Sequence, residues 1–599
     1  MAGRQDQHAG RVRSPEFARH AFPTIEMSLP IDTINGAPLA PEQTNYLTGF
    51  FAGLEARGLR FGDVEATPKP EKKVSLDDLI FEERVKRELH PLDAYPLLLD
   101  LAAINRAPDK EEIFRFKWNG LFFLTPNKEA FMARLRIPGG QLRTFQLREI
   151  AHIAKELTTG YVQVTTRANL QIRLIQPKDA PEVLRRIQSV GLHTRGAGAD
   201  NIRNLTANPT AGFDPHELID TMPLCHEMAQ IILNDRAFYD LPRKFNIAYD
   251  GGGLIGTVED TNDIGCKAVK VGEEVFFRIA LGGATGHKAF ARDLGVLVKP
   301  AALNKVVSAL VRVFMANGNR GDRKKARLKH LLEKWTLEQY LDETEKVLGY
   351  QLDRAPLDPA AISYPSQDIP HSHVGVYPQK QKGLNYVGLT IPVGQMTPKQ
   401  MIRVAEIADL YGSGEVRLTV WQNLIIPNVP DAFVETVKKA ARKAGFTTEQ
   451  SNLRSGFIAC TGNSYCKFAQ ADTKGHALEL MDWLDKRVQL DRPINVHLTG
   501  CPNSCAQHYM GDIGLLGTKT KVAGESVEGY HVFVGGGFGA KQAVGRQVFT
   551  GVAFGDLKGT LEKMLRAYQR HRTGSGESFQ EFTKRYDLNA LQAMFSNEE

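Results

Sequence analysis

The chain has 599 residues, more than a single hydrophobic core usually supports, so several domains are expected, roughly four at ~150 residues each. Apolar residues make up 42% and charged residues 24%, near the averages of globular proteins, which excludes a disordered, fibrous or coiled-coil chain. The net charge of +7 is too small an excess to indicate nucleic-acid binding, and no apolar run reaches the ~18 residues of a membrane helix.

The N-terminal 30 residues lack the apolar core of a secretory signal, and they carry arginines but few acids. Three interpretations stay open: a disordered leader, which is favoured, a transit peptide, or translation from Met27. Six cysteines are too few for a disulfide-built secreted scaffold. The predicted location is therefore the cytoplasm, where cysteines stay reduced and tend to bind metal or take part in chemistry.

An internal repeat organises the rest of the chain. The segment from Phe131 to Ile175 matches a second segment from Tyr386 to Pro427 at a constant offset of 254 residues. Identical pairs at this offset include Ile137/Ile391, Pro138/Pro392, Gly140/Gly394, Gln141/Gln395, Thr165/Thr419, Asn169/Asn423 and Leu170/Leu424. Because chance would not hold one register over some sixty residues, the unit is duplicated.

Each copy predicts the same elements. An apolar strand ends in a Pro-Gly turn, and an amphipathic helix follows, with Leu142, Phe145, Ile150, Ile153 and Leu157 at helical spacing in the first copy. A β-rich strand and a second helix come next. Two such half-sheets are expected to pair about a pseudo-two-fold axis. Mixed α/β segments follow at 195–345 and 450–595, and a proline-containing stretch at 346–380 is predicted to link the halves.

Four of the six cysteines cluster in the second α/β segment, as Cys460 and Cys466 in CTGNSYC and Cys501 and Cys505 in CPNSC. Four thiolates select zinc or an iron–sulfur cluster. The first spacing is wider than structural zinc usually uses, which favours a [4Fe–4S] cube. The corresponding stretch of the first half, LTANPTAG, has no cysteine. Cys225 and Cys266 lie apart and are expected to be ordinary packed or surface thiols.

These two cysteine motifs, together with the duplication, resemble the siroheme- and [4Fe–4S]-containing nitrite and sulfite reductases, from about residue 110 to 590. The resemblance implies an α+β fold: two ferredoxin-like half-domains that pair about a pseudo-two-fold axis, and two mixed α/β cofactor-binding domains. The implied domains are a leader and extension (1–115), a half-domain (116–190), an α/β domain (195–345), a linker (346–380), a half-domain (381–447) and an α/β domain (450–595).

The resemblance also implies the site residues. Cys460, Cys466, Cys501 and Cys505 hold the cube, and Cys505 bridges it to the siroheme iron. The positions that match the distal anion pocket are Arg134, Arg203, Lys244 and Asn246, and those that match the siroheme surroundings are Arg167, Gln171, Arg243 and Asn503. Fixed cations suit both a polycarboxylated macrocycle and an anionic substrate. The glycine-rich GGATG and GGGFG segments are either tight turns or backbone contacts to siroheme carboxylates.

Nitrite is the implied substrate, reduced by six electrons to ammonia. Asn246 in LPRKFN stands where sulfite reductases tend to carry a second lysine, and CTGNSYC and CPNSCAQ resemble the nitrite enzymes. The alternatives are an assimilatory sulfite reductase and, less favoured, the cobalamin-pathway monooxygenase that shares the fold. From a different class, the four cysteines would hold structural zinc in a non-catalytic binding module.

The electron source is predicted to be a separate carrier. The chain has no dinucleotide fingerprint, because GGGLIG at 251–256 lacks both the spacing and the acidic residue that follows it. Ferredoxin is the expected donor, and its acidic surface suits a mildly basic protein. The basic segment 319–335 is predicted to be an amphipathic helix with a solvated face, with ferredoxin docking as the alternative. A monomer that binds neither nucleic acid nor membrane is expected.

Overall fold

The computed structural model describes residues 33–34, 37–39, 41, 44, 75–124, 128–158, 160–356, 358–364 and 370–598. The chain divides into two compact units, Met1–Asp78 and Leu79–Glu599. In the first unit, β1 (Thr33–Ile34) pairs antiparallel with β2 (Ala37–Pro38), and a short 3-10 helix covers Leu76–Asp78. The leader of 30 residues, including Met27, lies outside the described residues.

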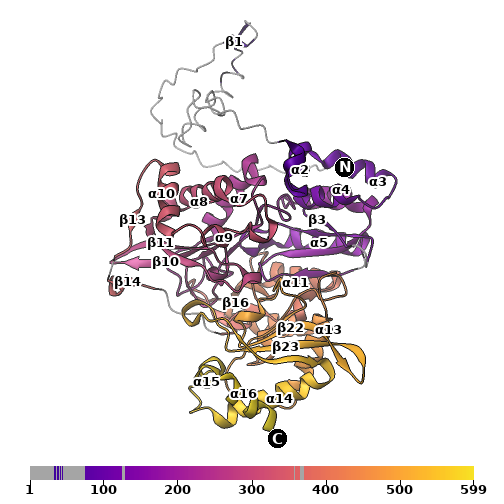
Figure 1. Cartoon of the computed structure of the whole chain (residues 1–599), viewed down its shortest axis with the longest axis vertical. Helices are drawn as coiled ribbons and strands as arrows, with labels where there is room; N and C mark the ends of the chain where they lie inside the picture. The colour runs from indigo at the N-terminus through magenta and orange to yellow at the C-terminus, as the bar shows by residue number, and fades with distance from the viewer. Residues whose placement is uncertain are drawn as a thin grey trace, which may run out of the picture. The chain divides into compact units, whose positions relative to one another are not determined.

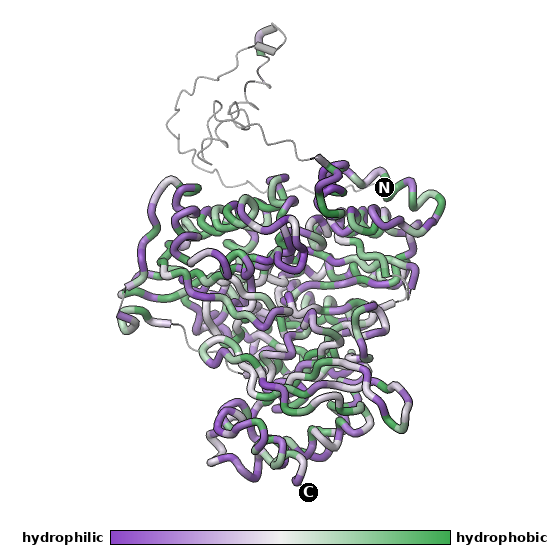
Figure 2. Tube along the Cα trace, in the orientation of Figure 1, coloured by the Kyte–Doolittle hydropathy of each residue, from purple (hydrophilic) through white to green (hydrophobic). Residues whose placement is uncertain are grey.

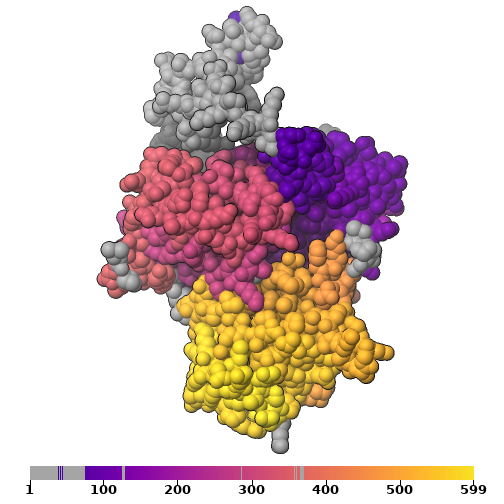
Figure 3. Space-filling model, viewed as in Figure 1, coloured from indigo at the N-terminus to yellow at the C-terminus, as the bar shows by residue number. Residues whose placement is uncertain are grey.

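The second unit begins with three helices, α2 (Phe81–Glu88), α3 (Tyr95–Ala103) and α4 (Lys110–Arg115). Ion pairs join α2 to the first α/β segment: Lys86 lies 2.8 Å from Asp240, and Arg320 lies 3.1 Å from Glu83. The ammonium of Lys86 is almost fully buried, and it tolerates burial because Glu83 also approaches it at 2.6 Å. The indigo and pink surfaces therefore abut in the space-filling view (Figure 3).

Two five-stranded antiparallel sheets form the centre of the fold, one from each copy of the repeat (Figure 1). The first has the order β17-β6-β7-β4-β3 and the second β15-β16-β19-β18-β5. The first copy comprises β3 (Leu121–Phe123), β4 (Phe131–Arg134), β5 (Gln141–Arg143), α5 (Thr144–Glu156), β6 (Val162–Val164), β7 (Leu170–Ile175) and α6 (Ala180–Ser189). The second comprises β15 (Gly375–Pro378), β16 (Leu384–Leu389), β17 (Gln395–Met396), α11 (Pro398–Tyr411), β18 (Glu415–Leu418), β19 (Leu424–Pro430) and α12 (Val434–Lys443).

The two copies exchange a strand. β5 of the first copy pairs with β18 of the second, so that Leu142 lies opposite Val416, and β17 of the second copy pairs with β6 of the first, so that Met396 lies opposite Val162. In the repeat, Leu142 corresponds to Met396 and Val162 corresponds to Val416, so the two pairings are equivalent. The predicted pseudo-two-fold pairing is therefore confirmed at the level of individual residues.

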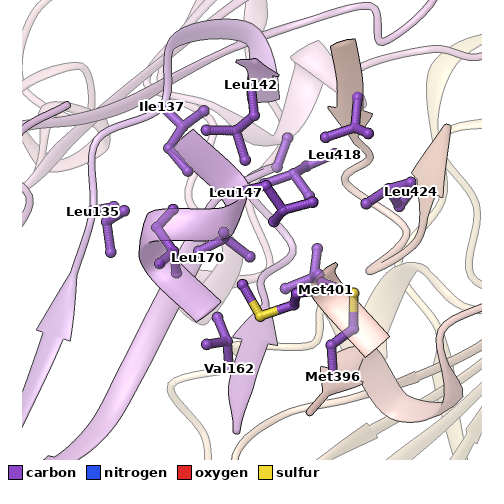
Figure 4. Packing of buried hydrophobic residues seen from close by; sticks show 14 of the residues in the cluster. Leu135, Ile137, Leu142, Leu147, Val162, Leu170, Met396, Met401, Leu418 and Leu424 are labelled. Carbon is purple, nitrogen blue, oxygen red and sulfur yellow. The ribbon is translucent and has the colours of Figure 1, made fainter. Parts of the chain in front are cut away.

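The exchange buries one shared hydrophobic core. Figure 4 shows side chains of both copies pointing toward one another, with Leu142 and Leu147 near Leu418 and Met401. Gly140 and Gly394 permit the close approach, because a Cβ atom would lie 2.6 Å from the Leu418 carbonyl oxygen and 2.8 Å from the Val164 carbonyl oxygen respectively. Larger side chains at either glycine would push the two copies apart.

Each copy leads into a mixed sheet covered by helices. The first sheet joins β8 (Ile202–Ala207), β9 (Phe245–Asp250), β10 (Ile264–Val271), β11 (Glu274–Leu281) and β12 (Arg292–Val298), with α7 (Met222–Asn234), α8 (Leu303–Asn317), α9 (Leu328–Leu331) and α10 (Leu337–Leu348). The second joins β20 (Phe457–Ala459), β21 (Val496–Thr499), β22 (Ile513–Val522), β23 (Glu525–Val534) and β24 (Arg546–Ala553), with α13 (Thr473–Asp485), α14 (Phe554–His571), α15 (Phe579–Arg585) and α16 (Leu588–Asn597). In both sheets the first three strands run parallel and the later ones antiparallel. The duplication thus extends to the α/β segments.

The predicted α+β fold with internal duplication is confirmed, and three local predictions need correction. Leu142 belongs to strand β5, not to the helix that follows, and Phe145 is 54% exposed. The predicted linker contributes β13 (Asp353–Arg354), which extends the first α/β sheet, β14 (Ile362–Ser363), which pairs with β10, and β15. Short strands at a sheet edge carry too few residues to show a hydrophobic period.

The basic segment 319–335 does not form the predicted amphipathic helix. It contains only a 3-10 turn at Arg323–Lys325 and the single turn α9. Three of its arginines turn inward and pair with acids: Arg320 with Glu83, Arg323 with Asp200 and Arg327 with Asp263. The charge pattern suggested a solvated face, but partners distant in the sequence bury Arg327 and cover Arg320 and Arg323 in part.

None of the described helices combines the length and the apolar character that crossing a bilayer requires. Figure 2 shows hydrophilic residues recurring between hydrophobic ones along the described chain.

Candidate active site

The four clustered cysteines follow two neighbouring strands. Cys460 comes directly after β20, and Cys501 and Cys505 lie in the loop after β21. Because β20 and β21 are adjacent and parallel, the loops at their carboxyl ends meet at one edge of the sheet. The backbone N–H of Gly500 donates to Cys460 Sγ at 3.2 Å, and the N–H of Gln470 donates to the Gly500 carbonyl at 2.8 Å. The two cysteine loops therefore form one structure.

The environment of these thiols fits a multi-iron cluster. Cys505 is exposed at the surface, and burial together with the nearby Cys460 raises the pKa of its thiol to about 11. Within the described part of the chain, no three His, Cys, Asp or Glu side chains converge on a single-ion site. Cys460, Cys466 and Cys501 all raise the pKa of Cys505, so the four thiols lie near one another, as a cube would need.

Side chains of the first copy of the repeat, among them Thr166 and Arg173, reach the cysteine loops. Thr166 Oγ1 donates to the carbonyl oxygen of Cys505 at 3.0 Å. Arg173 donates to Thr461 Oγ1, next to Cys460, at 2.8 Å, and its ring contact with Tyr465 measures 5.3 Å. Gln171 supports this arginine by accepting a hydrogen bond from it at 2.6 Å. Half-domain 1 and the cysteine loops thus form one site.

A group of buried cations from the first half faces the same region. Burial lowers the pKa of Arg134 and that of Arg203, the latter well below its usual value. Burial lowers the pKa of Arg167 to about 10, and burial together with Arg327 lowers the pKa of Lys244 to about 7. The nearby Cys505 partly offsets these shifts at Arg134, Arg167 and Lys244, which places the three cations around that thiol.

Few protein groups neutralise these cations. Among the described residues, Arg203 donates only to the carbonyl oxygens of Ala197 and Ala199, at 3.2 and 2.5 Å, and its Nε has no partner there. Arg134 contacts the ring of Phe122 at 4.6 Å, and its buried Nε is also without a partner. Across the described residues, no hydrogen bond or ion pair engages the ammonium of Lys244. Since buried unpaired charge is strongly destabilising, this surplus indicates a site built for an anionic occupant.

Two buried carboxylates organise the rim of the site. Asp263 is fully buried and accepts two hydrogen bonds from Arg327 Nη2, at 2.8 and 2.9 Å. Asn246 donates to the same carboxylate from its backbone at 2.9 Å and from its side chain at 3.2 Å. Asp200 pairs with Arg323 at 2.5 Å and lies 3.7 Å from Arg243. Asp263 and Asp200 are thus already neutralised by Arg327 and Arg323, and neither is available to neutralise Lys244.

The remaining predicted residues have different surroundings. Asn503 is exposed in the CPNSC loop, and Gly286 of GGATG packs against its carbonyl oxygen, where a Cβ would lie 3.1 Å away. Arg136 is 1% exposed and donates to the backbone carbonyls of Ile202 and Arg203, so it joins the half-domain to the α/β segment. Cys225 and Cys266 are buried away from the cluster, as expected.

Sequence reasoning missed Arg173, Arg327 and Asp263. One signal was available for the first: Arg173 lies two residues after Gln171 on β7, and residues at that spacing share a face of a strand. The pairing of Arg327 with Asp263 left no sequence signal, because 64 residues separate them.

The donor set therefore fits a [4Fe–4S] cluster beside siroheme. Four thiols occupy two joined loops, and Arg134, Arg167 and Lys244 lie close enough to Cys505 for its thiol to raise their pKa values. Siroheme carries carboxylates that such cations would bind, and the iron of a cluster would stabilise the thiolates that burial disfavours.

Comparisons with known proteins agree with this geometry. Residues 198–352 and 450–597 match the nitrite and sulphite reductase 4Fe-4S domain, and residues 125–190 and 377–444 match the nitrite/sulfite reductase ferredoxin-like half domain. The chain is 37% identical over 459 residues to ferredoxin–nitrite reductase of Synechococcus elongatus, covering 75% of this chain and 88% of the relative. It is 35% identical over 504 residues to the chloroplastic ferredoxin–nitrite reductase of Spinacia oleracea, covering 81% of this chain and 84% of the relative.

A solved structure is also similar. The Mycobacterium tuberculosis NirA protein superposes with a TM-score of 0.80 and 29% identity, covering 86% of this chain and 97% of that protein. Both domain types match in duplicate, in the order that the repeat predicts. The chain belongs to the nitrite and sulphite reductase family, whose cofactors are siroheme and a [4Fe–4S] cluster.

Proposed function

We propose that this protein is an assimilatory ferredoxin–nitrite reductase, which reduces nitrite by six electrons to ammonia. The observation that carries the proposal is the meeting of a buried surplus of cations from the first half with the Cys505 loop of the second. Relatives named ferredoxin–nitrite reductase in a cyanobacterium, plants and an archaeon support nitrite as the substrate. Turnover of nitrite and of sulfite by the purified holoprotein tests the proposal directly, because a sulfite reductase would prefer sulfite.

The residues of this chain divide the work. Cys460, Cys466, Cys501 and Cys505 would hold the cluster, with Cys505 as the bridging thiolate. Siroheme, when bound, supplies the iron at which nitrite is reduced. Arg167 and Arg243 would hold the carboxylates of the siroheme. Gln171 and Asn503 would lie beside the macrocycle and help to hold it.

Arg134, Arg203 and Lys244 would bind the nitrite oxygens, which must be protonated before they leave as water. Lys244 suits the proton-donating role best, because an ammonium with a pKa of about 7 gives up a proton near neutral pH far more readily than a guanidinium. Arg134 and Arg203 stay charged and stabilise the anion throughout.

Asn246 is proposed to set the preference for nitrite over sulfite. Sulfite carries more negative charge than nitrite near neutral pH, so it needs more positive charge in the pocket. We expect Asn246→Lys to raise the ratio of sulfite to nitrite turnover by about 10-fold, in line with one added charge–charge contact of ~1.4 kcal/mol. Initial rates with each anion, measured on holoprotein with equal siroheme content, check the expectation.

The repeat provides a matched control for this variant. Asn495 occupies the corresponding position of the second half, and its backbone N–H donates to Asp512 at 2.8 Å, as that of Asn246 donates to Asp263. Asn495→Lys should leave the ratio unchanged. An unaltered ratio in Asn246→Lys would remove Asn246 as the specificity determinant.

Ferredoxin is proposed as the electron donor, and a patch beside the cluster loop suits its acidic surface. Lys467 and Phe468 are exposed directly after Cys466, with Phe468 at 57%, and the exposed Lys128 lies 5.9 Å from the ring of Tyr465. An exposed aromatic ring next to a lysine is typical of a docking site for an acidic protein. The short path from this patch to Cys466 favours electron entry here.

Turnover with reduced ferredoxin is expected to fall as ionic strength rises, because salt screens the attraction between the two proteins. Lys467→Glu should raise the KM for ferredoxin by about 5-fold, since charge reversal at a rim contact costs ~1 kcal/mol. Turnover with a small dye donor should change in neither test. Lys439→Glu, at an exposed lysine of α12, is the matched control. A salt-independent rate with ferredoxin would argue against electrostatic docking.

The proposal also includes action in the cytoplasm as a monomer. Light scattering of the purified holoprotein at working concentration tests the second part, and fractionation of the source cells tests the first.

A further inference from the structure

The second half repeats the carboxylate that organises the rim of the candidate active site. The backbone N–H of Asn495 donates to the Asp512 carboxylate at 2.8 Å, and that of Gly535 donates to the Asp512 carbonyl at 3.0 Å. Asp263 accepts the same two bonds, from Asn246 and Gly282, each at 2.9 Å. The duplication therefore left a second position related to the active site by the pseudo-two-fold axis.

A cavity of about 870 Å³ lies at this second position. Trp421, which the repeat aligns with Arg167, lines it together with Phe538, Met510 and Leu254. Volumes of this order suit one small organic molecule. At the position where the candidate active site carries the Arg167 guanidinium, the wall of the second cavity thus carries the aromatic ring of Trp421, next to apolar side chains.

The charge of the second cavity also differs from that of the first site. Asp263 is neutralised by Arg327, whereas no ion pair reaches Asp512 within the described residues, and burial raises the pKa of Asp512 to about 6. Asp260 is 7% exposed and lines the cavity. Its Oδ2 accepts hydrogen bonds from Gly539 N–H and Gln542 Nε2, each at 2.9 Å, but its buried Oδ1 has no partner.

The basic residues around the cavity are already engaged. Lys267 pairs with Glu259 at 3.1 Å, Lys541 lies 3.5 Å from Glu581, and Arg492 donates to the Ser575 carbonyl at 2.9 Å. Burial raises the pKa values of Asp260 and Asp512, and Lys267 and Lys541 respectively lower them by less, so an added positive charge would favour the ionised form of each carboxyl group. A polycarboxylated macrocycle would meet like charge here, so the second cavity is unsuited to a second siroheme.

Aromatic faces in the cavity complement this negative charge. Trp421 stacks on His373 with ring centroids 5.6 Å apart, and it contacts Phe538 at 5.1 Å. Indole and phenyl faces attract cations, and they pack well against flat rings. A ligand with a flat apolar body and one positive charge would satisfy both the rings and the carboxylates.

We propose that this cavity binds a flat organic cation, an aromatic or conjugated molecule that carries a protonated amine or amidine. Its charge lies on the side of the cavity lined by Asp260 and Asp512, and its ring packs against the Trp421 and Phe538 side chains that line the cavity. Binding here does not depend on which anion the active site reduces.

Titration of the holoenzyme with benzamidine, a flat cation, tests the proposal. Calorimetry should give one saturable site with a Kd of about 0.1–1 mM, as expected for so small a ligand. Benzoate has the same shape and the opposite charge, and it should bind at least about 10-fold more weakly. Asp260→Asn should weaken benzamidine binding by about 10-fold, whereas Asp556→Asn, at an exposed acid of α14, should have no effect.

The location of the benzamidine site can be tested without a substitution of Asp260. The chain has four tryptophans, so 5-fluorotryptophan labelling gives few ¹⁹F resonances, and Trp421→Phe assigns one of them. Benzamidine should shift the Trp421 resonance and leave the others in place. Equal binding of benzamidine and benzoate, or an unmoved Trp421 resonance, would overturn the proposal even where Asp260→Asn fails to fold. None of these readouts measures nitrite turnover, so the result is separate from the proposed function.

Discussion

Replacing Cys505 by serine is expected to lower nitrite turnover by at least about 100-fold, with a dye donor as well as with ferredoxin. The first half contacts the Cys505 loop through Thr166, and Cys505 lies close enough to Arg134, Arg167 and Lys244 to raise their pKa values. A serine hydroxyl is a hard, weakly acidic ligand that does not replace a soft thiolate. Iron, acid-labile sulfide and siroheme content should be measured beside the rate.

The control for this variant is Cys225→Ser on α7. Cys225 is buried, and its Sγ lies 3.8 Å from the Leu205 carbonyl, outside the candidate active site. The Cys225→Ser protein should retain its iron, siroheme and nitrite turnover, with some loss of folding stability. A Cys505→Ser protein with a full complement of both cofactors and normal turnover would show that the bridging ligand is elsewhere.

Lys244→Ala is expected to lower kcat for nitrite by about 100- to 1000-fold while the visible siroheme spectrum is retained. The ammonium of Lys244 is buried among Arg203, Arg243 and Arg327, which together with burial lower its pKa to about 7. Its removal takes away a proton donor and a positive charge that no neighbour replaces, since the arginines keep their protons.

The split between kcat and KM separates the role of Lys244 in chemistry from simple anion attraction. Loss of attraction alone would raise KM and leave kcat largely unchanged. Lys299→Ala, at an exposed lysine that pairs with Glu274 at 3.5 Å, should behave as the unmodified protein. Full activity in Lys244→Ala would remove this lysine from the catalytic residues.

Several features of the site could be predicted from local sequence. The constant offset between the two repeat segments predicted the pseudo-two-fold pairing, because positions that recur in register must occupy equivalent environments. The four clustered cysteines predicted a metal centre, because thiols placed in two short loops can converge without help from distant residues. The arginines and the lysine of the first half were assigned through the resemblance of short motifs, and their roles stay predictions.

Other features depend on contacts between residues far apart in the chain. The exchange of β5 and β17 could not be predicted, because two- and three-residue strands carry no period of their own. The inward turn of Arg323 and Arg327 was missed for a related reason. A run of basic residues is consistent with a solvated helix until the fold brings Asp200 and Asp263 against it.

The sequence by itself determined that this protein is duplicated, that one half carries thiols and the other cations, and which residue types they are. Only the tertiary structure decided which charges remain unmatched. Arg327 is neutralised by Asp263 while Lys244 is not, and Asp512 keeps a charge that its counterpart Asp263 has neutralised. The physical reason is that the energy of a buried charge depends on its partners within a few ångströms, and folding chooses those partners from anywhere along the chain.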